Sequence, residues 1–233
     1  MLKLLGRHCI LNCLLPNYFI IIKMKLSSFP IAREHSLIVL MIALLSIIAF
    51  VVEQTISETI TDIFVYQRQL IAQGEVWRLV TGHLLHTNGF HLLLNLAALL
   101  MLWALHGRFY RIKNYCALFL FCALTTSIGI YFFNTSLIQY VGLSGVLHGI
   151  FIFGAIMDIK AKDKTGYLLF IGVWLKIAHE QIYGASTDVS DLIEASVAVD
   201  AHLWGAVGGL LFSISYLLFV DRQKKTSNLH SKI

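Results

Sequence analysis

The sequence predicts an all-α membrane protein in which six transmembrane helices form one bundle and both chain termini lie in the cytoplasm. Three observations predict this fold class: the composition, six long apolar runs, and the distribution of charge between those runs. Of the 233 residues, 58% are apolar and only 13% are charged, whereas soluble domains average about 25% charged residues. The composition therefore excludes an ordinary soluble domain and a disordered chain.

The apolar runs are long enough, or nearly so, to cross a hydrocarbon core of about 30 Å. Two of them are short and carry charged side chains, Asp158 in one and Lys176 with Glu180 in the other. The expected helices are 37–53, 84–106, 115–134, 143–159, 167–182 and 196–220.

The basic residues gather in alternate connections. Fifteen of the 18 lysines and arginines precede the first helix, join the second to the third or the fourth to the fifth, or follow the sixth. By the positive-inside rule these segments face the cytoplasm, and residues 54–83, 135–142 and 183–195 face outward. An odd number of helices would place basic connections on both faces, so the asymmetry supports six. The net charge of +5 thus reports orientation, and we expect no nucleic-acid partner.

The chain is expected to divide into three segments. Residues 1–35 form an N-terminal cytoplasmic segment, 36–221 the six-helix domain, and 222–233 a basic cytoplasmic tail. An apolar stretch near the N-terminus is only about 14 residues long and contains Pro16, so it is too short to span a bilayer. Because Met24 makes a natural start, we expect residues 1–23 to be a dispensable extension.

Polar side chains within spanning helices are costly and often functional. Counting from the cytoplasmic helix ends at about 1.5 Å per residue, Ser144, His91 and His202 lie about 24, 26 and 28 Å away. Any one of them alone is more often a packing or hydrogen-bonding side chain than a catalyst. Their common depth, a little below the outer surface, favours a shared site.

Two of the helices add features that suit acyl transfer. Ser144 lies in the tetrapeptide Gly142-Leu143-Ser144-Gly145, where glycine permits a sharp entry into a helix and the free N–H groups of the first turn favour negative charge. His91 and Asn95 are four residues apart, so both point from one helix face and can donate hydrogen bonds to an oxyanion.

The last helix presents His202 with Gly205 and Gly209 on one face, and the helix of Ser144 has matching Gly145 and Gly149. Small residues at this spacing let helix backbones approach closely. Such an approach is what a short serine side chain needs in order to reach a histidine on another helix.

Together these motifs resemble the rhomboid intramembrane serine proteases. Within that family the chain looks most like the rhombosortases, small bacterial members with a bare six-helix core; His148 and the run Lys176-Ile177-Ala178-His179-Glu180-Gln181 carry this finer likeness. The family motifs occur in the expected order over residues 36–220: Trp77-Arg78, His91-x-x-x-Asn95, Gly142-Leu143-Ser144-Gly145 and Ala201-His202-x-x-Gly205-x-x-x-Gly209.

The resemblance implies that Ser144 is the nucleophile and His202 the general base. His91, Asn95 and the backbone N–H of Ser144 are then the oxyanion donors. No acid lies at an obvious orienting position, since Asp200 points to a different helix face from His202. We therefore expect a dyad rather than a triad.

His148 follows Ser144 by four residues and lies on the same helix face. We expect it to pack against His202 and to set its orientation, with Gly142 and Gly205 as further supporting residues. The alternatives are a core histidine with no such role, and His148 itself as the base.

The resemblance also implies the partners. The substrates are expected to be secreted proteins anchored by a C-terminal tail, which consists of a Gly-Gly motif, one apolar helix and a basic end. Gly-Gly suits a membrane protease because helix-breaking residues expose the scissile carbonyl. The expected location is the inner membrane of a Gram-negative bacterium, with the site facing the periplasm; the oligomeric state is left open.

The same residues allow other functions. One alternative is a general rhomboid protease with other single-span substrates, and another is a non-catalytic relative that binds membrane helices. Its ten histidines also allow a haem-binding oxidoreductase. A zinc site is weaker, because His83-x-x-His86 lacks the spacing and the glutamate of the zincins. We expect neither a cofactor nor a metal.

Overall fold

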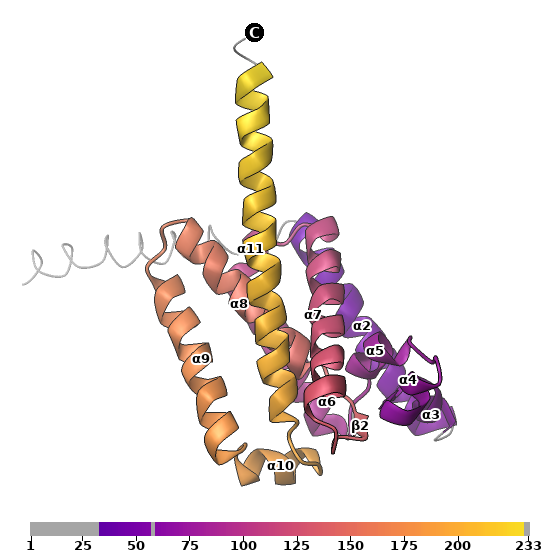
Figure 1. Ribbon diagram of the computed structural model, residues 1–233. Helices are drawn as coiled ribbons and strands as arrows, with labels where there is room; N and C mark the ends of the chain where they lie inside the picture. The colour runs from indigo at the N-terminus through magenta and orange to yellow at the C-terminus, as the bar shows by residue number, and fades with distance from the viewer. Residues whose placement is uncertain (1–32, 57–58, 231–233) are drawn as a thin grey trace, which may run out of the picture.

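The computed structural model describes residues 33–56 and 59–230 and is built almost entirely of helices (Figure 1). The expected extension over residues 1–23 lies outside this part of the chain. In chain order the elements are α2 (Arg33–Ile56), α3 (Thr59–Phe64), β1 (Tyr66–Gln67), α4 (Arg68–Ala72), α5 (Arg78–Thr81), η1 (Gly82–Leu84), α6 (Gly89–His106), η2 (Gly107–Phe109), α7 (Ile112–Phe133), β2 (Gln139–Tyr140), α8 (Ser144–Lys160), α9 (Thr165–Tyr183), α10 (Thr187–Ile193) and α11 (Val199–His230).

Four helices of the described residues are long and apolar enough to cross a membrane. They contain the segments Ser36–Thr55, Gly89–Phe109, Ile112–Phe133 and Val199–Gln223. The other two expected helices are present as α8 and α9, but α8 has only 17 residues and α9 carries Lys176 and Glu180. All six expected helices therefore exist, and the molecule is a multi-pass helical membrane protein with at least these four candidate spans.

The boundaries differ from the expected ones at two places. The helix expected from residue 84 begins at Gly89, because the side chain of Asn88 accepts a hydrogen bond from the backbone N–H of His91 at 2.9 Å and so caps the helix there. The helix expected to end at residue 220 continues as α11 to His230, into the residues expected as a basic tail, and projects beyond the other helices (Figure 1).

Close packing of α8 against α11 forms the centre of the bundle. A Cβ atom on Gly145 would lie 2.8 Å from the carbonyl oxygen of Ala201, and one on Gly205 would collide with the carbonyl oxygen of Gly145. The glycines on the two helices thus face one another, as the sequence predicted. Large apolar side chains at the periphery are exposed, including Leu40, Leu93 and Leu168, which is what a lipid-facing surface requires.

The connection between α2 and α6 is folded rather than extended. Its strand β1 pairs antiparallel with β2, with Tyr66 opposite Tyr140. Arg78 is buried and binds Glu75 at 2.6 Å and the carbonyl oxygen of Val65 at 2.8 Å. This segment holds the strand that leads into the start of α8.

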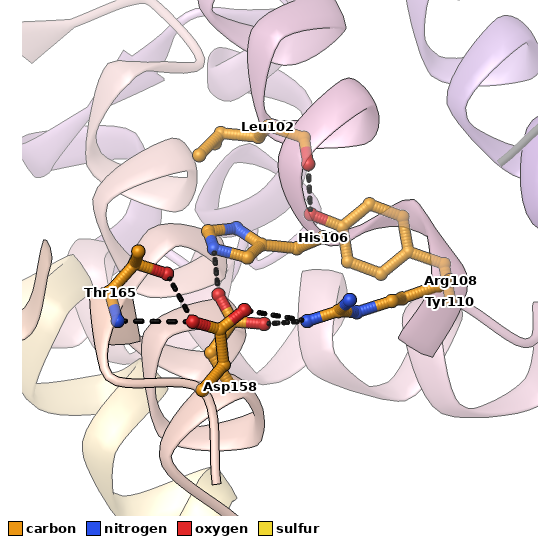
Figure 2. A network of polar contacts seen from close by, with 7 residues as sticks. Leu102, His106, Arg108, Tyr110, Asp158 and Thr165 are labelled. Carbon is orange, nitrogen blue, oxygen red and sulfur yellow. Dashed lines mark hydrogen bonds and ion pairs between the residues drawn. The ribbon is translucent and has the colours of Figure 1, made fainter. Parts of the chain in front are cut away.

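A polar network joins the C-terminal ends of α6 and α8 (Figure 2). Asp158 of α8 is buried and contacts His106 of α6 at 3.1 Å and Arg108 of η2 at 2.6 Å. Arg108 also lies 3.5 Å from Asp163, whose carboxylate accepts hydrogen bonds from Thr165. The charge on Asp158, which is unusual for a membrane helix, is thus explained by its partners, and the network ties α6 to α8.

Candidate active site

Ser144 is the first residue of α8, and its hydroxyl faces His202 of α11. The Ser144 Oγ lies 3.0 Å from the His202 Nε2, although the two residues are 58 positions apart. The close crossing of α8 and α11 makes this contact, because glycines at the crossing leave room for a short side chain to reach the next helix. A serine hydroxyl in hydrogen-bond contact with an imidazole is the arrangement of an activated nucleophile.

The turn before Ser144 is shaped by Gly142, whose φ of +119° is rarely adopted by other residues. Its carbonyl oxygen accepts a hydrogen bond from the Tyr140 hydroxyl at 2.7 Å, and its N–H donates to the Gly82 carbonyl oxygen at 3.2 Å. A Cβ atom at this position would lie 2.7 Å from the Nε2 of His91. Because Gly142 has no side chain, the His91 ring can lie beside Ser144.

His91 and Asn95 lie together on the face of α6 that is turned toward this glycine. Both are buried, and the Nδ2 of Asn95 donates to the carbonyl oxygen of His91 at 3.1 Å. The Nδ1 of His91 lies 3.1 Å from the Thr87 hydroxyl oxygen. The structure thus brings His91, Asn95 and Ser144 to one place, where donors can face an oxygen held near the serine.

His148 stacks directly on His202, with ring centroids 4.2 Å apart and an angle of 19° between the rings. The expected contact between these two histidines is therefore present. The Nδ1 of His148 lies 2.7 Å from the Ser144 carbonyl oxygen, and its Nε2 lies 2.9 Å from the Lys176 Nζ. Its ring nitrogens thus face groups other than the Ser144 hydroxyl, which disfavours His148 as the base.

The expectation that no acid lies at an orienting position is wrong. Glu180 of α9 places its Oε2 2.8 Å from the Nδ1 of His202, on the side of the ring opposite Ser144. The sequence shows Glu180 and Lys176 four residues apart on α9, but it does not show how α9 is rotated about its axis. Asp200, the acid considered from the sequence, instead accepts a hydrogen bond from Asn134 at 2.6 Å.

His148, Glu180 and His202 also offer atoms that could bind a metal, all within 4.8 Å of one another. Lys176 Nζ, however, lies 2.9 Å from His148, 2.8 Å from Glu180 and 3.3 Å from His202. The ammonium group of Lys176 thus occupies the position where a metal ion would bind His148, Glu180 and His202. An ammonium and a metal ion exclude each other at this distance because their charges repel.

The other histidine pair considered from the sequence, His83 and His86, does not form a metal-like cluster. The His83 Nε2 lies 3.0 Å from both the Ala123 carbonyl oxygen and the Ser127 hydroxyl, while His86 packs edge-on against His91. Burial lowers the pKa of His83 to about 4 and that of His86 to about 3. Both side chains are therefore neutral structural groups at pH 7.

Two cavities meet at Ser144. The smaller, about 150 Å³, lies between β2 and the segment leading into α11, and its lining includes Thr87, Gln139 and Ser196. The larger, about 320 Å³, lies between α6, α8, α9, α10 and α11 and is mostly apolar, with Leu94 and Val189 in its lining. A chain lying across the site would have room on both sides of the serine.

The short helix α10 lies next to the site, between the end of α9 and the start of α11 (Figure 1). The Thr87 hydroxyl donates to the Ile193 carbonyl oxygen at 2.7 Å, and the Asn88 amide donates to the Leu192 carbonyl oxygen at 3.0 Å. These two bonds join the start of α6 to α10. Val189 and Ile193 of α10 line the larger cavity, so α10 forms part of its cover.

The fold and this site define a class of protein, namely a multi-pass helical membrane protein with a serine and a histidine paired between two closely packed helices. Residues 73–219 match the family model of the Rhomboid domain, and the chain belongs to the rhomboid family. The rhomboid protease GluP of Bacillus subtilis (strain 168) is 29% identical to it over 174 residues, which cover 73% of this chain and 32% of that protein. The chain thus spans about a third of the length of this relative.

Proposed function

We propose that the chain is an intramembrane serine endopeptidase that uses Ser144 as nucleophile and His202 as general base. The observation that carries the proposal is the 3.0 Å contact between the Ser144 hydroxyl and the His202 Nε2 at the edge of two cavities. The family match over residues 73–219 and the likeness to a protein named as a rhomboid protease support the same activity.

The geometry supports an acyl-transfer mechanism. His202 removes the proton from Ser144 as its oxygen attacks the scissile carbonyl carbon, and the carbonyl oxygen becomes an oxyanion. His91, Asn95 and the backbone N–H of Ser144 donate hydrogen bonds to that oxyanion. The intermediate collapses to an acyl-enzyme while His202 returns the proton to the departing amine. Water, deprotonated by His202, then releases the acyl group and restores Ser144.

The proposed topology has six spanning helices, with both termini in the cytoplasm. Four spans satisfy the length and composition of a membrane helix, and α8 and α9 complete the set as two shorter crossings. The basic connection between them, Lys160–Lys164, then faces the cytoplasm. Ser144, at the other end of α8, lies on the outward side, which is the periplasm if the membrane is the inner membrane of a Gram-negative bacterium.

For the substrate we propose single-span proteins with a C-terminal tail of a Gly-Gly motif, one apolar helix and a basic end. The apolar lining of the larger cavity suits an apolar segment beside the scissile bond. His148 and the Lys176–Gln181 run, which suggested the rhombosortases, both lie at the site through the contacts of His148, Lys176 and Glu180. The second candidate is a rhomboid protease that accepts other single-span substrates.

The test is cleavage of tailed reporters by the purified protein in liposomes. Ser144→Ala is expected to abolish cleavage, a loss far greater than the roughly 100-fold that removal of one oxyanion donor causes. Ser190→Ala is the matched control, because Ser190 lies on α10 and, among the residues that the structure describes, its hydroxyl bonds only to the nearby Ser186 carbonyl oxygen. Unchanged cleavage by Ser144→Ala would contradict the mechanism.

The substrate class is tested with two reporters that share one apolar helix and one basic end. One carries Gly-Gly before the helix and the other carries Leu-Leu. Faster cleavage of the Gly-Gly reporter supports the tail specificity. Equal cleavage of both, still dependent on Ser144, supports the general rhomboid protease instead.

A further inference from the structure

The two ring nitrogens of His202 face different partners, and only one protonation pattern allows the ring to act as a base. The Nε2 lies 3.0 Å from the Ser144 hydroxyl. To accept that proton, Nε2 must carry no hydrogen, so in the neutral ring the hydrogen must sit on Nδ1. Whatever lies at Nδ1 therefore determines whether His202 can activate Ser144.

Two groups of opposite hydrogen-bonding character lie close to the Nδ1 of His202. The Glu180 Oε2, 2.8 Å away, can only accept a hydrogen bond when ionised, which requires the hydrogen on Nδ1. The Lys176 Nζ, 3.3 Å away, can only donate, which would require Nδ1 to be bare and Nε2 to hold the hydrogen. The two neighbours thus favour opposite tautomers, and the glutamate is the closer.

Lys176 makes two shorter contacts, with Glu180 and His148, that compete with its contact to His202. Its ammonium donates to the Glu180 Oε2 at 2.8 Å and to the His148 Nε2 at 2.9 Å. Because His148 Nε2 accepts that bond, the hydrogen of His148 lies on Nδ1 and is donated to the Ser144 carbonyl oxygen at 2.7 Å. The ring hydrogens of His202 and His148 and two of the three ammonium hydrogens of Lys176 then have acceptors.

The side chains of His202 and Glu180 are only 6% and 12% exposed, whereas that of Lys176 is 45% exposed. The contact between His202 and Glu180 is therefore the less screened by water. The charged and titratable groups beside the His202 ring are His148 of α8 with Lys176 and Glu180 of α9, and His91 of α6 lies across Ser144.

We propose that Glu180 is a positioning residue that selects the Nδ1–H tautomer of His202, and that Lys176 is a competing donor held off by Glu180 and His148. The site then works as a Ser144–His202–Glu180 triad with a lysine as its counter-charge, rather than as a dyad. The proposal rests on the proposed protease function. It differs from a plain ion pair within α9, in which Glu180 would serve only Lys176.

The test compares Glu180→Ala, Lys176→Met and the double variant in the liposome assay. Glu180→Ala leaves Lys176 as the partner of Nδ1 and imposes the wrong tautomer, so kcat should fall by about 100-fold or more, with KM changed little. Lys176→Met keeps the glutamate and removes the competing donor, so its kcat should fall clearly less than that of Glu180→Ala. In the double variant the competing donor is gone, so kcat should recover at least about tenfold relative to Glu180→Ala.

A double variant no more active than Glu180→Ala would overturn the competition between the two residues. A Glu180→Ala variant with nearly normal kcat would overturn the positioning role. A role only in the stability of α9 predicts the reverse of recovery, since two losses in one helix would add. Thermal unfolding of each variant shows whether it is folded.

The rate at which a fluorophosphonate labels Ser144 is measured in parallel, because this reaction requires the serine and its base but no protein substrate. The labelling rates should follow the same order as kcat. Wild-type protein that is labelled but cleaves no reporter would separate an incorrect substrate from an incorrect site. Wild-type protein that is neither labelled nor active would reject the protease function and the triad together.

Discussion

Gly142 shows how one residue places two functional groups at once. Its backbone turns the chain into α8 with a φ of +119°, and its missing side chain leaves space for the His91 ring. The backbone conformation and the space taken by His91 both require glycine at position 142. A larger residue would be strained and would also displace His91. The sequence marked this glycine as a turn but could not show what lies over it.

We expect Gly142→Ala to lower kcat about 100-fold, since misplacing a catalytic group by about 1 Å can cost that much. Gly74→Ala is the matched control, because Gly74 also has a positive φ, +106°, but nothing lies within 4 Å of its added Cβ. Both variants carry a similar backbone strain of about 1–3 kcal/mol. Cleavage rates and thermal unfolding in detergent separate the two effects; equal loss of activity in both variants would contradict the role of His91.

At the scale of elements, the crossing of α8 and α11 determines the Ser144–His202 distance. Gly145 and Gly205 face each other with no space for a side chain, and Gly149 and Gly209 meet one turn further on. Because dispersion attraction and close packing depend on this contact, the two helices cannot separate without moving the serine from the histidine.

Gly205→Ala is therefore expected to force α8 and α11 apart. Overpacking of this kind costs about 1–3 kcal/mol, so thermal unfolding should occur at lower temperature, and kcat should fall with it. Gly172→Ala in α9 provides the comparison, because nothing lies within 4 Å of its added Cβ and an alanine within a helix stabilises by about 0.5–1 kcal/mol relative to glycine. A Gly205→Ala protein with unchanged unfolding and activity would show that the crossing tolerates a wider separation.

At the scale of the whole molecule, the charge asymmetry and the positions of α8 and α9 together require a definite topology. If both helices cross the membrane, residue 164 before α9 lies in the cytoplasm and residue 186 after it lies outside. We expect Ser186→Cys to react with a membrane-impermeant maleimide in intact spheroplasts, and Lys164→Cys to react only after lysis. The unmodified chain, whose four cysteines are Cys9, Cys13, Cys116 and Cys122, gives the background. Reaction of both positions from the same side would contradict six spans.

Much of this arrangement could be predicted from the sequence. Apolar length located the six helices, and counting residues from the basic connections placed Ser144, His91 and His202 at one depth. These inferences succeeded because hydrophobicity and helical rise act along the chain. The start of α6 was predicted five residues too early, since a capping side chain, Asn88, and not the end of the apolar run, decides where the helix begins.

The acid beside His202 could not be predicted in the same way. Glu180 belongs to a different helix, and its contact with His202 depends on the rotation and tilt of α9, which no single sequence pattern encodes. Arg78 is a similar case: the motif marked it, but its buried contacts with Glu75 and Val65 arise from the fold of the connection between α2 and α6. Side chains that meet through tertiary packing are visible only once the helices are placed.

The network in Figure 2 joins the C-terminal ends of α6 and α8 to each other, and these are the helices that carry His91 and Ser144 at their other ends. α9 stands at the side of the larger cavity and carries both Lys176 and Glu180. A displacement of α9 that widened this cavity would also withdraw Glu180 from His202, so under the proposed function the entry of a substrate and the orientation of the base would depend on the position of the same helix.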